Sequence, residues 1–243
     1  MIPLRDANPT RRRPIVTYLI IALCCLAFGL ELWIQASDGE GGLERLFLTY
    51  GLVPGDLTGA TGTGVAGLGQ AMVALFSHLF LHGGWLHLGG NMLYLWIFGN
   101  NIEDRFGRLR FLGFYLIGGL VAALSQVWIA PGSTTPLIGA SGAIAAVLGA
   151  YLVLYPGARV LSLVFLVFFY QLLNVPAVIV LGLWFVLQLL SGVGSLSASA
   201  DGGVAFFAHI GGFVAGLVIG LLVRSVGGWS GRAGQPSGRV GVG

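Results

Sequence analysis

Long apolar runs separated by short polar segments dominate the sequence of this chain. The first run extends from about residue 14 to residue 33, close to the roughly 20 residues that a helix needs to cross a bilayer. Five further runs are near that length or a little shorter, and they lie at roughly 84–103, 109–130, 141–155, 175–192 and 208–225. The pattern therefore predicts an all-α polytopic membrane protein whose six transmembrane helices form one compact bundle.

Two stretches depart from this pattern. Residues 35–70 are polar and glycine-rich, and we expect them to form the longest loop of the protein. Residues 157–174 contain a β-branched and aromatic run, which we interpret as a partly buried loop of interfacial character. Periodicity alone leaves a seventh short span open as an alternative for this segment.

The two ends of the chain have a different composition from the apolar middle. We expect residues 1–13 to be a basic cytoplasmic N-terminus and residues 14–225 to be the membrane domain. Residues 226–243 are mainly glycine, serine and arginine with little to bury, and we expect a disordered cytoplasmic tail. The first apolar run is longer than the core of a signal peptide, so it predicts a retained helix.

Composition agrees with a membrane setting. Hydrophobic residues make up 56% of the chain and charged residues 9%, whereas about 25% of residues in soluble domains are charged. The isoelectric point near 9.1 comes from arginines at the ends of apolar runs, not from a basic patch with interleaved aromatic residues. We therefore expect the lipid bilayer, and no nucleic acid, as a partner.

The arginines also predict an orientation. With a cytoplasmic N-terminus, six spans place every arginine except Arg45 on the cytoplasmic side. A seventh span would move the arginines near the C-terminus to the outside and break this pattern. The sequence thus predicts a multi-pass protein of the plasma membrane with both termini in the cytoplasm.

A candidate nucleophile lies at the start of the fourth run. Ser141 stands between Gly139-Ala140 and Gly142, where a serine can also simply cap a helix. Counted from the expected cytoplasmic ends of their runs, at Pro156, Arg224 and Arg105, Ser141, His209 and Asn91 all lie about 21–22 Å deep at 1.5 Å per residue. His87 precedes Asn91 by one helical turn and shares its face.

Small residues could bring these groups together. Gly212, Gly216 and Gly220 form a stripe on the last run beside His209, and Gly142 begins a matching stripe beside Ser141. Such stripes often serve packing only. Here they favour a dyad in which His209 is the general base for Ser141, without an acidic third member. His87, Asn91 and the backbone N–H of Ser141 would stabilise an oxyanion.

Taken together, these motifs resemble those of the rhomboid intramembrane serine proteases. The residues that carry the resemblance are Gly139-Ala140-Ser141-Gly142, the spaced set His78, His82, His87 and Asn91, Glu103-Asp104-Arg105, and Ala208-His209-Ile210-Gly211-Gly212. The resemblance implies a six-helix bundle with short helices at the site, Ser141 as nucleophile, His209 as base, and His87 and Asn91 as oxyanion donors. It also implies a structural Glu103–Arg105 ion pair, transmembrane proteins as substrates, and no metal or cofactor.

Some features leave alternatives open. Many members of this family have an aromatic residue where this chain has Ala145, and some have a Trp-Arg pair that the first loop lacks. Phe206 or Phe207 could supply the missing ring beside His209. His78 and His82 could bind a metal, although core hydrogen bonding suits them better without a nearby carboxylate or thiolate. A non-cutting relative that binds membrane clients, or a transporter, are the other function classes.

Overall fold

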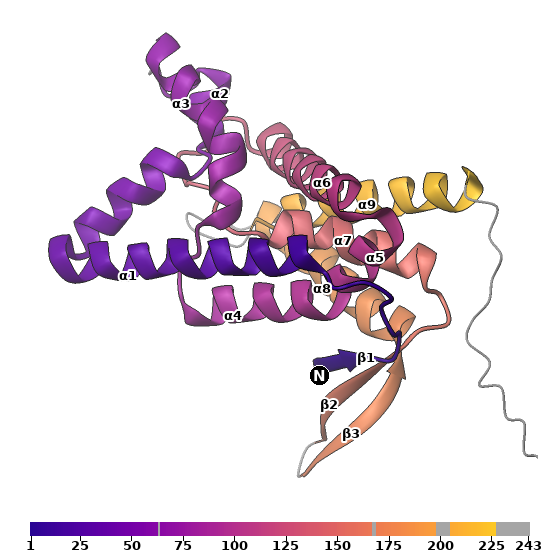
Figure 1. Cartoon of the computed structure of the whole chain (residues 1–243). Coiled ribbons are helices and arrows are strands. Elements are labelled where there is room, and N and C mark those ends of the chain that lie inside the picture. Colours follow the sequence, from indigo (N-terminus) through magenta and orange to yellow (C-terminus); the bar gives the residue numbers. More distant parts are fainter. Residues whose placement is uncertain (63, 167–168, 198–204, 227–243) are drawn as a thin grey trace, which may run out of the picture.

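The computed structural model of the chain describes residues 1–62, 64–166, 169–197 and 205–226, and most of them are helical (Figure 1). A short 3₁₀ helix, η1 (His78–Phe80), and a π-helical segment, η2 (Leu95–Gly99), join longer helices. The α-helices are α1 (Ile15–Tyr50), α2 (Pro54–Thr58), α3 (Gly64–Ser77), α4 (Trp85–Tyr94), α5 (Asn100–Phe106), α6 (Arg108–Ile129), α7 (Ser141–Leu154), α8 (Ala177–Ser197) and α9 (Phe206–Val226).

The helices correspond closely to the expected spans. In the described part of the chain, α1, α6 and α9 are long and apolar enough to cross a membrane. Residues 69–80 and 85–106 form a pair bent by 77° that qualifies together as a fourth span. The helices α7 and α8 are apolar but shorter. This set is consistent with six spans, and it shows an integral membrane protein.

The prediction of a long loop at residues 35–70 is wrong. Helix α1 continues to Tyr50 through a sharp bend at Gly39, whose φ of 69° suits glycine, and α2 and the start of α3 follow. Leu43, Leu46 and Phe47 repeat at the i, i+3, i+4 spacing of a helix, and all three are partly buried. This apolar spacing outweighs the glycine content that favoured a loop.

The prediction of a loop at residues 157–174 is also wrong, because this segment forms regular secondary structure. Strands β2 (Arg159–Leu166) and β3 (Phe169–Pro176) form an antiparallel hairpin, and β1 (Ile2–Asp6) pairs with β2 to give the order β1-β2-β3. The β-branched and aromatic residues of this segment favour a strand over a coil or a span. The protein is therefore mostly helical, and part of the basic N-terminus belongs to a small sheet.

Other expectations concern residues that the structure leaves undescribed. Residues 227–243 of the expected disordered tail, including Arg232 and Arg239, lie outside the described ranges. The domain limits drawn at residues 13 and 225 remain predictions.

Helix α7 lies at the centre of the bundle, with α6 and α9 beside it (Figure 1). Every residue from Gly142 to Tyr151 is buried. A Cβ atom on Gly216 of α9 would overlap the carbonyl oxygen of Ala146, and one on Gly212 would overlap that of Gly142. The glycine stripes therefore permit the backbone contact between α7 and α9 that the sequence suggested.

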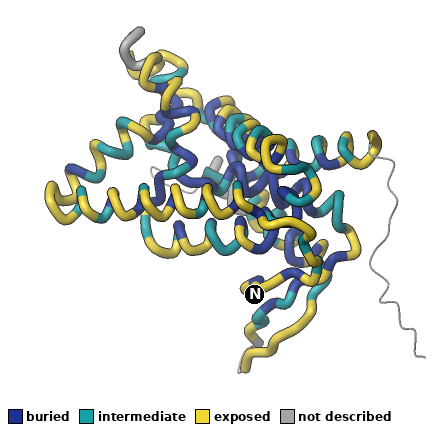
Figure 2. The backbone as a smooth tube through the Cα atoms, in the orientation of Figure 1, coloured by how far each residue is buried: buried dark blue, intermediate teal, exposed yellow. Residues whose placement is uncertain are grey.

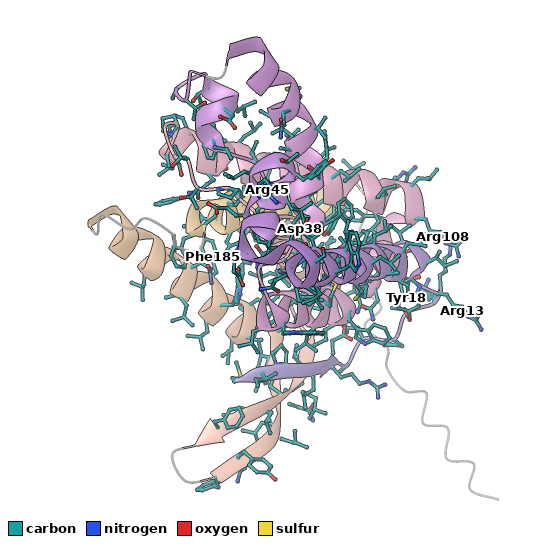
Figure 3. All side chains as sticks on the ribbon, turned by 90° about the vertical axis from the view of Figure 1, so that its left-hand side faces the viewer. Arg13, Tyr18, Asp38, Arg45, Arg108 and Phe185 are labelled. Carbon is teal, nitrogen blue, oxygen red and sulfur yellow. The ribbon has the colours of Figure 1, made fainter. Side chains whose placement is uncertain are left out.

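Several of the described arginines gather at one end of the bundle. Arg13, before α1, and Arg108, at the start of α6, lie near each other in Figure 3, and both line a surface hollow with Arg12 and Arg110. Asp38 and Arg45 lie near the bend of α1, at the opposite end of its first segment. We call the two ends the arginine-rich side and the arginine-poor side.

Candidate active site

Ser141 is the first residue of α7, which begins inside the bundle because the helix has only 14 residues. The segment before it is fixed by backbone hydrogen bonds. The N–H of Gly139 donates to the carbonyl of His78 at 2.8 Å, and Leu52 and Leu137 exchange two hydrogen bonds. Gly139 has a φ of 120°, and a Cβ atom there would lie 2.7 Å from Nε2 of His87. Only glycine suits this position.

His209 lies in direct contact with the serine. Its Nε2 is 2.6 Å from Oγ of Ser141, and its Nδ1 is 2.7 Å from Oε1 of Gln188. Because the Gln188 oxygen can only accept, Nδ1 of His209 carries the proton and Nε2 accepts the hydrogen bond of the serine hydroxyl. This is the tautomer that a general base for Ser141 requires.

Two neighbours of His209 on α8 were not anticipated from the sequence. Gln188 bonds to the imidazole, and the ring of Trp184 lies 5.8 Å from it between centroids. The ring beside His209 is thus Trp184, not Phe206 or Phe207. Gln188 is the one polar side chain between Val178 and Leu190, and an isolated polar residue in an apolar span is a signal of function that could have revealed it.

His87 and Asn91 lie on α4 and face the same site. The N–H of Gly83 donates to Nδ1 of His87 at 3.3 Å, so the neutral ring carries its proton on Nε2, the atom near Gly139. Asn91 is buried, and its Nδ2 has no hydrogen-bond partner among the described residues. Two donors are therefore available close to Ser141.

A cavity of about 820 Å³ connects these residues. Ser141, His209, His87 and Asn91 all line it. The remaining wall includes Ser133 and Pro136, from the segment that joins the end of α6 to α7, which is the arginine-poor side. Polar groups inside an apolar bundle thus share one hollow, where water and a peptide could reach them.

His78 and His82 make hydrogen bonds beside this site. The ring of His78 bonds to the carbonyl of Ala74 at 2.8 Å, and the ring of His82 bonds to that of Phe80 at 3.1 Å. The backbone N–H of His82 donates to the carboxylate of Glu31, a buried residue of α1. In the described ranges, His, Cys, Asp and Glu side chains form no group of three suited to a metal.

Glu103 differs from its expected role. Its carboxylate accepts hydrogen bonds from the backbone N–H groups of Val16 and Thr17 and from the hydroxyl of Thr17, at 2.8–3.0 Å. The expected ion pair with Arg105 does not occur among the described residues. A buried carboxylate at this position accepts hydrogen bonds from the free N–H groups at the start of α1. Its negative charge also interacts favourably with the positive end of the helix dipole.

Comparison with known proteins extends this description. A family model described as the Rhomboid domain matches residues 69–226, which is more than half of the chain. The chain is similar to rhomboid protease GluP of Bacillus subtilis, with 34% identity over 140 residues that cover 58% of this chain and 24% of the relative. It is also similar to RHOMBOID-like protein 4 of Arabidopsis thaliana, with 34% identity over 164 residues, 67% of this chain and 37% of the relative.

A mitochondrial protein is similar over a shorter region. Rhomboid protein 1 of Saccharomyces cerevisiae has 33% identity over 97 residues, which cover 38% of this chain and 28% of the yeast protein. The alignments with these three relatives thus span between 24% and 37% of each relative's length.

Proposed function

Since the chain belongs to the rhomboid family, we propose that it is an intramembrane serine endopeptidase that cuts transmembrane segments of other proteins. The observation that supports this most directly is the 2.6 Å contact between Oγ of Ser141 and Nε2 of His209 inside a bundle of apolar helices. A serine bonded to a correctly protonated imidazole is the arrangement that nucleophilic catalysis by serine requires.

In the first half of the proposed reaction, Oγ of Ser141 attacks the carbonyl carbon of the scissile peptide bond. The hydroxyl proton passes to Nε2 of His209, and the developing imidazolium keeps its hydrogen bond to Oε1 of Gln188. His209 then donates this proton to the leaving amine as the C–N bond breaks. Gln188 is therefore the third member of the constellation, and it orients the base without an acidic charge.

The peptide oxygen becomes negatively charged in the tetrahedral intermediate. Nδ2 of Asn91, Nε2–H of His87 and the N–H of Ser141 at the start of α7 are the donors that we assign to it. Donors that are already in place need no rearrangement when the charge develops, and each is worth about 10²–10³ in rate in soluble hydrolases. The positive end of the helix dipole of α7 adds to this effect.

In the second half, water hydrolyses the acyl-enzyme. His209 removes a proton from the water as it attacks the ester carbonyl, and it returns a proton to Oγ of Ser141 as the ester bond breaks. The cavity supplies the water, because its wall includes polar residues of the segment at the arginine-poor side, such as Ser133. The substrate is expected to enter from the membrane and to be cut near its outer end.

The setting of this reaction is also part of the proposal. We assign the protein to the plasma membrane, with the arginine-rich side in the cytoplasm, because positively charged residues are retained on that side. Its partners are then the lipid bilayer and membrane-protein substrates. The proposed chemistry uses side chains and backbone of this chain, with no metal or cofactor.

A serine-directed fluorophosphonate probe tests this function on the purified protein in detergent. The wild type should be labelled and should cleave a model transmembrane substrate, and Ser141→Ala and His209→Ala should lose both properties while keeping their melting temperature. Ser37→Ala, which changes an exposed serine of α1, is the matched control and should behave as the wild type. Labelling that persists in Ser141→Ala would overturn the assignment of the nucleophile.

A further inference from the structure

The sheet formed by β1, β2 and β3 exposes an apolar surface that the proposed chemistry does not use. Paired residues of antiparallel strands point to the same face, and the register pairs Leu163 with Leu172 and Phe165 with Tyr170. With Leu161, these residues form what we call the outer face. Phe165, Tyr170 and Leu172 are 59%, 70% and 57% exposed, which is unusual for large apolar side chains of one small surface.

The opposite face, which we call the inner face, is attached to the helical bundle at its base. Val160 and Ser162 are fully buried there. Their neighbour Asp6 on β1 accepts hydrogen bonds from the hydroxyl of Tyr151 on α7 and from the amide of Asn101 on α5. Figure 2 shows the contrast between the buried base of β2 and the exposed length of β3. At the base of the sheet the outer face is therefore turned away from the protein, whereas Phe169 and Leu173 of the inner face, farther along the hairpin, are exposed.

Charge on this surface is confined to its base. No residue from Val160 to Val175 is charged. Arg159 is the first residue of β2, and Arg5 of β1 is paired with Leu161 of β2; both arginines are exposed. An apolar surface bordered by arginines is typical of segments that lie in a membrane interface, where apolar side chains enter the acyl region and arginines meet lipid phosphates.

We propose that the outer face of the sheet inserts into the lipid leaflet on the arginine-rich side of the membrane, at the boundary between headgroups and acyl chains. In this position the sheet is a lateral anchor of the bundle, with Arg5 and Arg159 at the level of the phosphates. The inference concerns membrane attachment, and it does not depend on the proposed peptidase activity.

The neighbouring surface supports lipid as the occupant. Strand β3 leads directly into α8, whose side chains Val178, Ile179 and Leu183 are also exposed and apolar. The outer face therefore continues the lipid-facing surface of the bundle. Figure 1 shows the hairpin projecting sideways from the start of α8, across the direction of α1, with the far ends of β2 and β3 beyond β1 and away from the helices.

The free edge of β3 limits the depth of insertion. Among the described strands β3 pairs with β2 alone, so the backbone N–H and C=O groups along its other edge have no partner in this sheet. Open sheet edges do not occur in the hydrocarbon core, where each unpaired group costs several kcal/mol. The edge must therefore reach headgroups or water, and Tyr170 has the amphipathic ring that is enriched at this level.

Site-directed spin labelling can test this position residue by residue. The labels are placed on cysteines introduced one at a time into a Cys24→Ala, Cys25→Ala, Ser141→Ala background, in vesicles of phosphatidylethanolamine and phosphatidylglycerol. The scanned positions are Leu163, Phe165, Tyr170 and Leu172 on the outer face and Val164 and Gln171 on the inner face. Collisions with oxygen report lipid, and collisions with a water-soluble nickel chelate report water. Val186 on α8 and Asp38 near the bend of α1 are the lipid and water controls.

The proposal predicts an alternation with a period of two residues. The ratio of oxygen to nickel collisions should approach the Val186 value at the outer-face positions and should be several-fold lower at Gln171. Ratios near the Asp38 value at every position would overturn the proposal, because the sheet would then lie in water. It would also be overturned if labels at Phe165 were shielded from both reagents and showed spin–spin broadening, because a second copy of the chain would then cover this face.

A charge placed on either face separates lipid contact from folding. Leu172→Asp should expel the outer face from the leaflet, so that a label at Tyr170 becomes several-fold more accessible to nickel. The matched variant Gln171→Asp puts the same charge on the adjacent inner-face residue, and it should leave the Tyr170 label unchanged. An equal response to both variants in proteins of unchanged melting temperature would contradict a face-specific contact with lipid.

Discussion

At the scale of single residues, the proposed site is distinguished by a donor without a partner. Asn91 is buried, yet its Nδ2 bonds to no described residue, although a buried unpaired amide usually costs about 1–3 kcal/mol. This cost is explained if the amide donates a hydrogen bond to the oxyanion, whose negative charge exists only during the reaction. Asn91 therefore suits a role in catalysis better than a role in folding.

Replacing Asn91 tests this role separately from the dyad. Asn91→Ala should lower turnover by about 10²–10³ and leave the KM for a model substrate largely unchanged, because the donor acts only on the oxyanion. Acylation passes through the same oxyanion, so fluorophosphonate labelling should be slower but complete. His209→Ala should be labelled scarcely at all. The reverse order, with Asn91→Ala inert and His209→Ala labelled, would contradict the two roles.

Gln188 offers a second test among the residues of the site. Gln188→Leu should lower kcat by about 10-fold to 10²-fold, a part of the 10²–10⁴ that a general base contributes, because the imidazole loses the acceptor that fixes its tautomer. Gln188→Glu keeps an acceptor oxygen at 2.7 Å from Nδ1 and should recover most of the lost rate. If both variants had equal rates, hydrogen bonding to His209 would not be the function of Gln188.

Asp6 lies outside the spans and gives a prediction about pH. Burial raises the pKa of Asp6 above its ordinary value of 3.8, although Tyr151 and Asn101 donate hydrogen bonds to it. The folded state thus binds this proton more tightly than the unfolded state. The stability contributed by Asp6 is present below the ordinary value and is lost as the pH rises through the raised pKa.

Asp6→Asn stays neutral and keeps an acceptor oxygen. Its melting temperature relative to the wild type should therefore increase as the pH is raised from about 4 to about 7, a range chosen to begin near the ordinary value for aspartate. Thermal unfolding in detergent at a series of pH values measures this difference. A difference that is flat or decreases with pH would show that Asp6 is not disfavoured as an anion.

The sequence could indicate most of the site at this scale because its residue types are rare in an apolar chain. Ser141, His209 and Asn91 could be compared by their distance from the expected cytoplasmic ends of their runs, and the structure brings them to one cavity. Gln188 could not be identified in this way, because the sequence does not show which face of α8 is turned toward α9. Only the structure shows that Gln188 lies on the face next to His209. The role of Glu103 could not be predicted either, because its hydrogen-bond partners belong to α1, and the sequence does not show that α1 and α5 meet.

At the scale of elements, the glycines of α9 allow its backbone to lie in close contact with that of α7. Gly216→Leu should force the two helices apart, because even a Cβ atom would overlap the carbonyl of Ala146. Overpacking of this kind costs about 1–3 kcal/mol or more, and it would also lengthen the bond between Ser141 and His209. Both the melting temperature and the turnover should fall.

Gly182→Leu is the matched control for this variant. Gly182 lies in α8, and a Cβ atom there would meet no atom within 4 Å. The same change of residue should therefore leave the melting temperature and turnover close to the wild-type values. If Gly216→Leu were as well tolerated as Gly182→Leu, the backbones of α7 and α9 would not be in contact at this point.

The elements also show which sequence signals were misleading. Apolar runs predicted the helices α6 to α9 within a few residues, because a run of that length has few other ways to satisfy its backbone in a membrane. In the proposed orientation the segments 35–70 and 157–174 lie at or beyond the membrane boundary, where helix, strand and loop are all possible. There the spacing of Leu43, Leu46 and Phe47 and the pairing of β2 with β3 decide the structure.

At the scale of the whole molecule, the two sides of the bundle differ in charge and in access to the cavity. The arginines before α1 and at the start of α6 mark one side, and the cavity wall includes the segment between α6 and α7 on the other. Single cysteines can determine the orientation that we propose. In spheroplasts of a bacterial host, a membrane-impermeant maleimide should label Asp38→Cys at once and Arg108→Cys only after permeabilisation. Labelling in the opposite order would invert the proposed topology.

The shortness of α7 has a consequence for the membrane as an electrical barrier. Because α7 begins at Ser141, the cavity reaches into the bundle, and in the proposed orientation the layer beneath it is the buried segment from Gly142 to Tyr151. Ten helical residues are about 15 Å long, roughly half of an ordinary hydrocarbon core. The voltage across the membrane therefore falls over a shorter path at this point. From Gly142 to Ala150 this segment is buried and carries no polar side chain, so it offers ions no polar path.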